Sequence, residues 1–140
     1  MNAVTLPASA TPPQAMRPSM RVAQFGLFLL ATISILGGTL QMVLGQPETT
    51  PRLDNVHRFM AGIYMSTGFI CAWTAVTIRK QGMLVYLLAL GVFIAGCGRL
   101  LSISQVGLPQ PAALWLGYLV PELLAPIVIA WCHRISRSSR

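Results

Sequence analysis

The amino-acid sequence predicts an all-α membrane protein in which four transmembrane helices form an up-down-up-down antiparallel bundle. Three observations predict this fold. Of the 140 residues, 54% are hydrophobic and only 9% are charged, whereas soluble domains carry roughly 25% charged residues. Four long apolar stretches also follow one another along the chain. A soluble domain of this size has a large surface for its volume, and so few charged side chains cannot cover it.

The first segment, residues 1–20, is predicted to be a disordered cytoplasmic tail. Prolines interrupt a run of alanine, serine and threonine at Pro7, Pro12, Pro13 and Pro18. Such a composition buries too little apolar surface to fold. The apolar stretch that follows Arg21 is too long for the core of a signal peptide, so we expect it to remain as a membrane anchor.

The transmembrane domain is predicted to span residues 21–134, with helices at about 22–44, 57–78, 82–104 and 112–132. Each segment has the roughly 20 residues that a helix needs to cross a hydrocarbon core of ~30 Å, and a helix satisfies its own backbone groups in lipid. The third segment contains one charge, Arg99, and the fourth contains one, Glu122. Short connections make neighbouring helices antiparallel.

Small residues spaced four apart predict where these helices touch, because they let backbones approach closely. On the first two helices the pairs are Ser34/Gly38, Gly62/Ser66 and Gly68/Ala72. On the third helix we expect a longer contact stripe made by Gly91, Ala95, Gly98 and Ser102.

The distribution of Lys and Arg predicts the orientation, since basic residues accumulate on the cytoplasmic side. Two basic residues, Arg52 and Arg58, fall on one side, whereas the other side holds Arg17, Arg21, Arg79, Lys80, Arg134, Arg137 and Arg140. We therefore expect a multi-pass protein of the bacterial inner membrane with both termini in the cytoplasm, residues 135–140 forming a basic tail. The predicted partner of these charges is the lipid bilayer rather than a nucleic acid, because they lie in small groups between apolar stretches and form no continuous basic face.

Arg99 and Glu122 are the two charges that the topology does not explain. A charge near the middle of a spanning helix costs about 2.5–3.5 kcal/mol and is usually paired or faces water. The two residues have opposite charge and lie on adjacent helices in the same half of the membrane, so we expect a contact or a shared polar cavity. Trp115 and Tyr118 share a helix face with Glu122 and would form an aromatic wall beside it. The alternative is that they belong, with Tyr86 and Trp131, to the aromatic belts at the membrane interfaces.

Arg58 is expected to join this site from the start of the second helix. Asp54 precedes it by four residues, which is the favourable order for an ion pair on a helix, and Asp54 or Asn55 can cap that helix. The candidate ligand-binding or ion-pair residues are thus Arg58, Arg99, Glu122, Asp54, Asn55, Tyr118 and Trp115.

No catalytic, metal or cofactor site is predicted. His57 and His133 are expected on opposite faces of the membrane, so they cannot ligate one haem. Cys71, Cys97 and Cys132 have no metal-binding or disulfide spacing, and the sequence contains no nucleotide-binding fingerprint.

Three stretches resemble one protein family: LDNVHRFMAGIYMSTG (residues 53–68), GCGRLLSISQVGLPQP (96–111) and YLVPELLAPIVIAW (118–131). They are similar to the DUF4345 family of small bacterial four-helix membrane proteins of unknown function, over roughly residues 22–133. The resemblance implies the four-helix architecture and the prominence of Arg58, Arg99 and Glu122. It implies no substrate.

Taken together, the sequence favours a non-enzymatic membrane protein whose periplasm-facing polar site binds or moves a small amphipathic or anionic molecule, such as a lipid. An alternative is a structural or accessory subunit in which the Arg99–Glu122 pair fixes helix packing, with a second copy or another membrane subunit as partner. A third hypothesis, a small proton-coupled exporter, depends on the single membrane carboxylate of Glu122.

Overall fold

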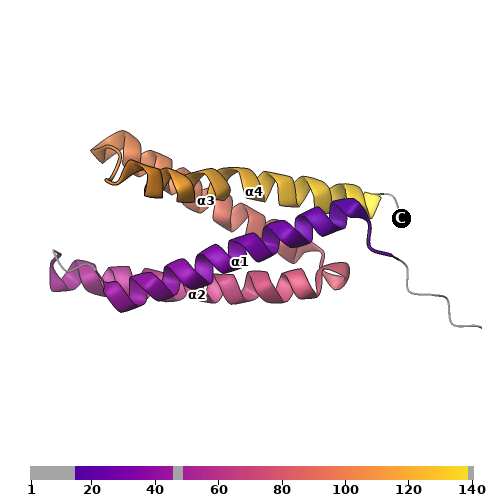
Figure 1. Cartoon of the computed structure of the whole chain (residues 1–140), viewed down its shortest axis with the longest axis horizontal. Helices are drawn as coiled ribbons and strands as arrows, with labels where there is room; N and C mark the ends of the chain where they lie inside the picture. The colour runs from indigo at the N-terminus through magenta and orange to yellow at the C-terminus, as the bar shows by residue number, and fades with distance from the viewer. Residues whose placement is uncertain (1–14, 46–48, 139–140) are drawn as a thin grey trace, which may run out of the picture.

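The computed structural model describes residues 15–45 and 49–138, which form four long α-helices joined by short connections. Their order is α1 (Pro18–Leu44), α2 (Pro51–Val76), the short 3₁₀ helix η1 (Ile78–Lys80), α3 (Met83–Val106) and α4 (Ala112–Ser138). Consecutive α-helices run antiparallel (Figure 1). Residues 1–14 of the predicted tail and residues 139–140 of the predicted basic tail lie outside the described residues.

All four α-helices are long and apolar enough to cross a membrane, so the chain is a multi-pass membrane protein with the predicted all-α four-helix fold. Large apolar side chains such as Phe25, Leu36 and Trp131 lie on the outside. Lipid tails solvate such side chains as well as a protein core does, so the hydrophobic effect does not drive these helices together. Close packing and polar contacts must hold the bundle together instead.

The helices extend beyond the predicted spans at four ends, namely the starts of α1 and α2 and the ends of α3 and α4. α1 begins at Pro18 rather than at residue 22, and α2 begins at Pro51 rather than at residue 57. Each proline lies in the first turn of its helix, where its missing N–H leaves no hydrogen bond unmade. The predicted spans cover only the length needed to cross the hydrocarbon core. They leave out helical turns in the interfacial layer, so the predicted starts of α1 and α2 lie too far along the chain.

Thr50, rather than Asp54 or Asn55, caps α2. Its hydroxyl oxygen accepts a hydrogen bond from the backbone N–H of Leu53 at 3.3 Å. At the other end of the chain, α4 continues to Ser138 instead of ending at residue 132. The segment predicted as a tail from residue 135 is therefore helical as far as it is described.

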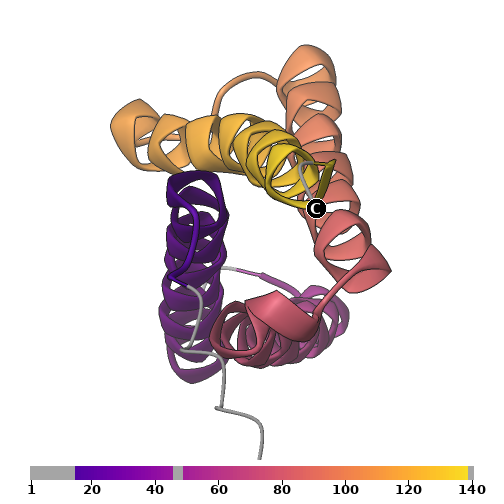
Figure 2. The same ribbon diagram turned by 90° about the vertical axis from the view of Figure 1, so that its right-hand side faces the viewer.

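In cross-section the helices lie at the corners of a square in chain order (Figure 2). α1 packs closely along α2 and also against α4, and α3 packs against α4. By contrast, α2 and α3 barely touch although η1 connects them. The bundle is thus sealed on three sides and open along the seam between α2 and α3.

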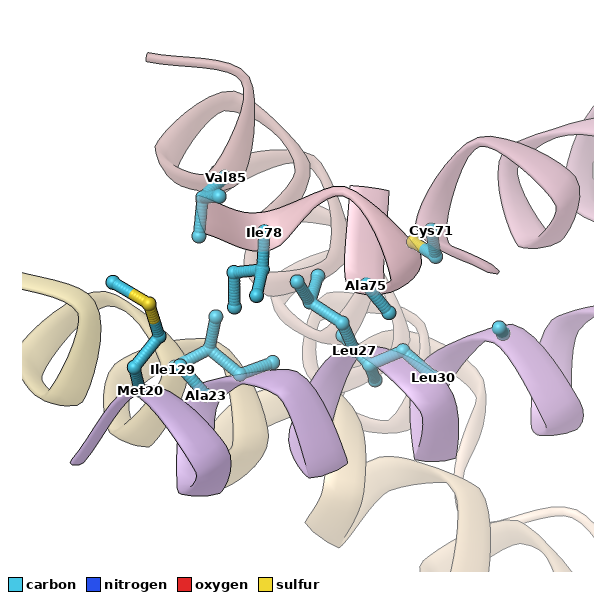
Figure 3. Close-up of a cluster of buried hydrophobic side chains, with 10 residues drawn as sticks. Met20, Ala23, Leu27, Leu30, Cys71, Ala75, Ile78, Val85 and Ile129 are labelled. Atoms are coloured by element: carbon cyan, nitrogen blue, oxygen red, sulfur yellow. The ribbon is translucent and has the colours of Figure 1, made fainter. Parts of the chain in front are cut away.

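The two ends of the bundle differ. The closed end holds the start of α1, η1 and the end of α4, whereas the open end holds the end of α1, the start of α2 and the connection at residues 107–111. Toward the open end the α1–α2 and α3–α4 hairpins diverge (Figure 1). The hydrophobic core lies at the closed end, where all four helices meet (Figure 3), and it includes Met20, Ala23, Leu27, Leu30, Cys71, Ala75, Ile78, Val85 and Ile129.

Small residues let the helices of each hairpin approach closely. A Cβ added at Gly68 of α2 would lie 2.7 Å from Cγ1 of Ile35 and 3.0 Å from its backbone nitrogen on α1. The α3–α4 contact uses Gly96, where a Cβ would lie 2.8 Å from Cδ2 of Leu123. The predicted contact stripe on α3 is wrong for Gly91 and Gly98, because no heavy atom lies within 4 Å of a Cβ built at either.

Candidate functional site

Arg99 of α3 and Glu122 of α4 form an ion pair inside the membrane-spanning part of the bundle. The Nε of Arg99 donates a hydrogen bond to Oε2 of Glu122 at 2.6 Å. The Glu122 side chain is only 5% exposed, whereas the Arg99 side chain is 29% exposed. The contact predicted between these two charges is therefore present, with the carboxylate buried and the guanidinium reaching the surface of the bundle.

Local sequence explains why the pair lies at this position. Gly96 brings α3 so close to α4 that a Cβ there would lie 3.3 Å from Cβ of Glu122. Arg99 follows Gly96 by three residues and so projects from the same helix face. Pro126 lies inside α4 and has no N–H to donate to the carbonyl of Glu122. A backbone oxygen without its helical partner therefore accompanies the ion pair.

Two aromatic rings of α4 contact the guanidinium group. The Cζ of Arg99 lies 5.8 Å from the ring centroid of Trp115 and 5.7 Å from that of Tyr118. Both distances fall within the ~6 Å range of cation–π attraction. The indole N–H of Trp115 donates to the carbonyl of Gln110 at 3.4 Å, which fixes the ring at the start of α4. The predicted aromatic wall thus orients Arg99.

The guanidinium keeps hydrogen-bonding capacity after these contacts. Glu122 occupies Nε, and the two terminal nitrogens of Arg99 make no hydrogen bond with any residue in the described part of the chain. The planar fork of a guanidinium matches two oxygens of a carboxylate or a phosphate. Because Glu122 balances the charge, the pair is tolerated in the membrane while these donors stay available for the oxygens of an anion.

A cleft of about 280 Å³ lies along the open seam between α2 and α3. Its walls are apolar and come from both helices: Met60 and Ile63 from α2, and Leu88, Gly91 and Ala95 from α3. Ser34 of α1 and Glu122 of α4 also line it. Of the ion pair, Glu122 lines the cleft, whereas Arg99 lies one helical turn beyond the lining residue Ala95, outside the lining itself.

Tyr64 is a site residue that the sequence analysis missed. It lines the cleft from α2, lies within hydrogen-bonding reach of the Ser34 side chain, and is close enough to Glu122, Arg99 and Tyr118 to interact electrostatically with them. A tyrosine in the middle of a spanning helix lies outside the interfacial belts where tyrosine is common. The position of Tyr64 in the middle of an apolar segment is therefore the feature of the sequence that could have identified it.

Arg58 and Asp54 lie elsewhere, in the α1–α2 hairpin at the open end. The Nε of Arg58 donates to Oδ2 of Asp54 at 2.8 Å, and its Nη1 donates to the carbonyl of Met42 on α1. Tyr64 lies six residues further along α2, which is about 9 Å along the helix and about 120° around it. The structure therefore does not bring Arg58 to the Arg99–Glu122 pair.

The turn between α1 and α2 accounts for this placement. Gly45 ends α1 with φ +59°, and a side chain there would collide with Arg58 and Asp54. Glycine adopts this left-handed conformation without steric cost. Asn55 is exposed on α2 and does not belong to the cleft.

The histidines lie at opposite ends of the bundle, His57 in α2 near the open end and His133 in α4 near the closed end. His133 is fully buried, with its ring 5.2 Å from that of Tyr86 in an edge-to-face arrangement. Within residues 15–45 and 49–138, no three His, Cys, Asp or Glu side chains are grouped so that they could hold a metal ion.

Comparisons with known proteins place the chain at the level of a family. Neither the curated proteins nor the solved structures give a match. A family model described as a domain of unknown function (DUF4345) matches residues 22–133. The matched region contains all of α2 and α3 and includes Arg58, Arg99 and Glu122. Because the match covers most of the chain, the protein belongs to the DUF4345 family.

Proposed function

We propose that this protein binds a small amphipathic anion, with the head group at Arg99 and the apolar tail in the cleft between α2 and α3. The observation that carries the proposal is that the Arg99 guanidinium is held in place while two of its nitrogens remain unbonded. Glu122 and two aromatic rings hold it in place, yet both terminal nitrogens have no protein partner in the described residues. In this proposal the protein binds or moves the molecule and performs no chemistry on it.

The cleft favours an apolar tail of modest size. Its volume of about 280 Å³ is near the lower end of the roughly 300–1,000 Å³ typical of small-molecule sites. Because α2 and α3 barely touch, such a tail can enter from the lipid between them without separating any of the helix pairs that pack closely. One end of the molecule would then meet lipid-like walls and the other would meet the N–H groups of Arg99.

A second candidate function is purely structural, and the burial of Glu122 favours it. A buried ion pair between two helices fixes their register even when no ligand is bound. In that case the Arg99–Glu122 pair would position α3 against α4 within an accessory subunit of a membrane complex. The ligand-binding function requires the terminal nitrogens of Arg99 to bind an anion, whereas the structural function makes no use of them.

Paired probes separate the two candidates. Dodecanoate and dodecyltrimethylammonium carry the same alkyl chain and opposite charges, and their binding to the purified protein in mild detergent can be measured by native mass spectrometry. We expect dodecanoate to bind at least tenfold more tightly, since charge-assisted bonds to a carboxylate contribute more than about 1.5 kcal/mol. Equal binding of the two probes would eliminate the anion site.

The matched variants are Arg99→Gln and Arg52→Gln, because Arg52 is exposed near the start of α2 and its loss changes the net charge equally. Arg99→Gln is expected to abolish the preference for dodecanoate, and Arg52→Gln is expected to keep it. A preference that survives in Arg99→Gln leaves the structural role as the better explanation. Mass spectrometry of molecules that co-purify with the wild-type protein would then identify the natural ligand.

The orientation belongs to the same proposal: the closed end faces the cytoplasm of a bacterial inner membrane and the open end faces the periplasm. Arg52 and Arg58 are near the open end, whereas the described basic residues at the closed end are Arg17, Arg21, Arg79, Lys80, Arg134 and Arg137. This asymmetry follows the distribution typical of cytoplasmic loops.

The orientation is tested with single cysteines in a background without native cysteines. A cysteine in place of Val106, which is exposed at the open end, should react with a membrane-impermeant maleimide in intact spheroplasts. A cysteine in place of Ser138 should react only after lysis. The reverse pattern would invert the proposed topology.

A further inference from the structure

A second cavity, shallow and open to the outside, lies at the closed end between the start of α3 and the end of α4, separate from the α2–α3 cleft. Its volume is about 460 Å³, and it is lined by Gly82, Met83 and Tyr86 of α3 and by Arg134, Arg137 and Ser138 of α4. Arg137 is held in place because its Nη1 donates to the carbonyl of Gln81 at 2.5 Å. Arg134 is exposed and forms no hydrogen bond or ion pair with another described residue.

Among the residues that the structure describes, the two arginines at this cavity have no acidic partner. The three acidic residues are Glu48, Asp54 and Glu122. Glu48 belongs to the segment between α1 and α2, Asp54 pairs with Arg58, and Glu122 pairs with Arg99. An anion from outside the protein therefore meets no competing carboxylate of the described residues at Arg134 and Arg137.

The backbone adds to this positive field. α3 begins after Gly82, and no side chain caps its first turn. Unpaired N–H groups at a helix start carry partial positive charge and favour phosphate oxygens. Gly82 also leaves room for Arg137, since a Cβ there would lie 3.4 Å from Nη1 of Arg137. The helix start thus reinforces the two arginines that line the same cavity.

An apolar groove continues from this cavity along α3 and α4. Its volume is about 240 Å³, and Tyr86 lines both the groove and the basic cavity. From Tyr86 the groove follows Ala89, Leu90 and Phe93 on α3, and Ala130, Ile127 and Pro126 on α4. It therefore extends about 10 Å from the membrane surface toward the middle of the bilayer, at 1.5 Å per residue. Figure 2 shows that α3 and α4, which form it, lie side by side.

We propose that the basic cavity and the apolar groove together bind one anionic phospholipid, with its phosphate at Arg134 and Arg137 and an acyl chain in the groove. Two arginines and a helix start match the phosphate oxygens. The continuous apolar groove distinguishes a lipid from free phosphate, because a free phosphate would make no use of it. This site is independent of the proposed function of Arg99, and either can fail without the other.

The test is a lipid titration of the full chain in mild detergent, followed by native mass spectrometry. Dioleoyl phosphatidylglycerol is compared with dioleoyl phosphatidylcholine, which has the same chains and no net charge. We expect phosphatidylglycerol to bind at least tenfold more tightly, because each nearby arginine contributes about 1 kcal/mol toward an anionic lipid. Equal affinities for the two lipids would overturn the proposal.

Matched charge variants locate the site. Arg134→Gln combined with Arg137→Gln should remove the preference for phosphatidylglycerol. Arg79→Gln combined with Lys80→Gln removes the same charge from η1, at the same end but outside the cavity, and should preserve it. Arg134→Gln alone, which breaks no internal contact, should reduce the preference about fivefold. An equal loss in the Arg79/Lys80 variant would show that only overall surface charge matters, and would overturn the cavity.

A final pair of measurements distinguishes the lipid from a free phosphate. Ala130→Phe narrows the groove and should weaken phosphatidylglycerol binding, with no change in the weak binding of glycerol 3-phosphate. If glycerol 3-phosphate instead displaced phosphatidylglycerol at equal concentration, and Ala130→Phe had no effect, the site would bind phosphate alone and the lipid assignment would be wrong.

Discussion

Gly38 of α1 lies directly against the backbone of Ala61 in α2. A Cβ added at Gly38 would be 2.8 Å from the carbonyl oxygen of Ala61 and 2.8 Å from the backbone nitrogen of Met65. Real Cβ atoms do not approach backbone atoms so closely, and neither backbone atom can move without shifting a helix. This contact joins α1 and α2 in the half of the bundle away from the hydrophobic core.

Gly38→Val is therefore expected to destabilise the α1–α2 hairpin, because overpacking of a tight contact costs about 1–3 kcal/mol. The measurement is thermal unfolding in detergent followed by circular dichroism. Gly98→Ala is the matched control, since no heavy atom lies within 4 Å of its added Cβ and alanine favours helix. Equal stability of Gly38→Val and wild type would show that the helices separate more easily than this contact indicates.

Glu122→Gln is expected to lower the apparent Tm in detergent. It leaves Arg99 without its countercharge. Breaking a fully buried pair costs about 3–5 kcal/mol, and the partial exposure of Arg99 reduces this to about 1–3 kcal/mol. The double variant Arg99→Met, Glu122→Leu should recover the lost stability, because apolar replacements of a buried pair are often neutral or stabilising.

The same double variant divides the two candidate functions. If the pair serves only to fix packing, the recovered fold should be accompanied by a recovered function in the cell. If Arg99 binds an anion, the double variant should be stable and still unable to bind dodecanoate. Recovered dodecanoate binding would contradict the proposed site.

Gly91→Leu is expected to fill part of the cleft between α2 and α3 and to weaken dodecanoate binding at least tenfold, which corresponds to about 1.4 kcal/mol. No heavy atom lies within 4 Å of a Cβ at Gly91, so the fold should tolerate the side chain. Gly98→Leu places the same side chain on the same helix, outside the lining of the cleft, and should leave binding unchanged. Equal effects of the two variants would argue against the cleft as the site of the tail.

His133→Met is expected to preserve or raise thermal stability by about 1 kcal/mol. Neither ring nitrogen of His133 makes a hydrogen bond of good geometry within the described part of the chain, although the backbone of Gln81 is near enough to interact with the ring. A buried polar group without a partner costs about 1–3 kcal/mol. Methionine is similar in volume and adapts its shape to the site. His133→Ala should instead cost about 2 kcal/mol or more through the cavity it leaves. If both variants lost equal stability, the imidazole would have a polar role.

The spans could be predicted from the sequence because charges in lipid are costly, so long uncharged stretches leave few alternatives. The Arg99–Glu122 contact could be predicted for the same reason, since opposite charges on adjacent helices stabilise one another. Arg58 shows the limit of this reasoning. Sequence spacing gives the depth of a side chain and its helix face, but not the angle between two hairpins, and it is this angle that separates Arg58 from Arg99.

The small residues of α3 show a second limit. Spacing identifies Gly91 as a position where a neighbour can approach, but it does not say whether a neighbour does. In the structure α2 does not pack against α3 at Gly91, which lines a cleft instead. Tyr64 was missed because its role depends on Ser34 and Glu122, which lie on two other helices. A single sequence does not show which residues of different helices come into contact, so it does not reveal such a combination.

The location of the hydrophobic core at one end has a mechanical consequence. The hydrophobic core that joins the two hairpins lies at the closed end, so a rotation of one hairpin against the other about this core would move their open ends the most. The helices extend roughly 20 residues, or about 30 Å, beyond the centre of the core, so a rotation of about 5° there shifts their open ends by about 2.6 Å. A small rotation within the core that contains Leu27 and Ile129 therefore changes the separation of the two hairpins at the open end by more than the length of a C–C bond.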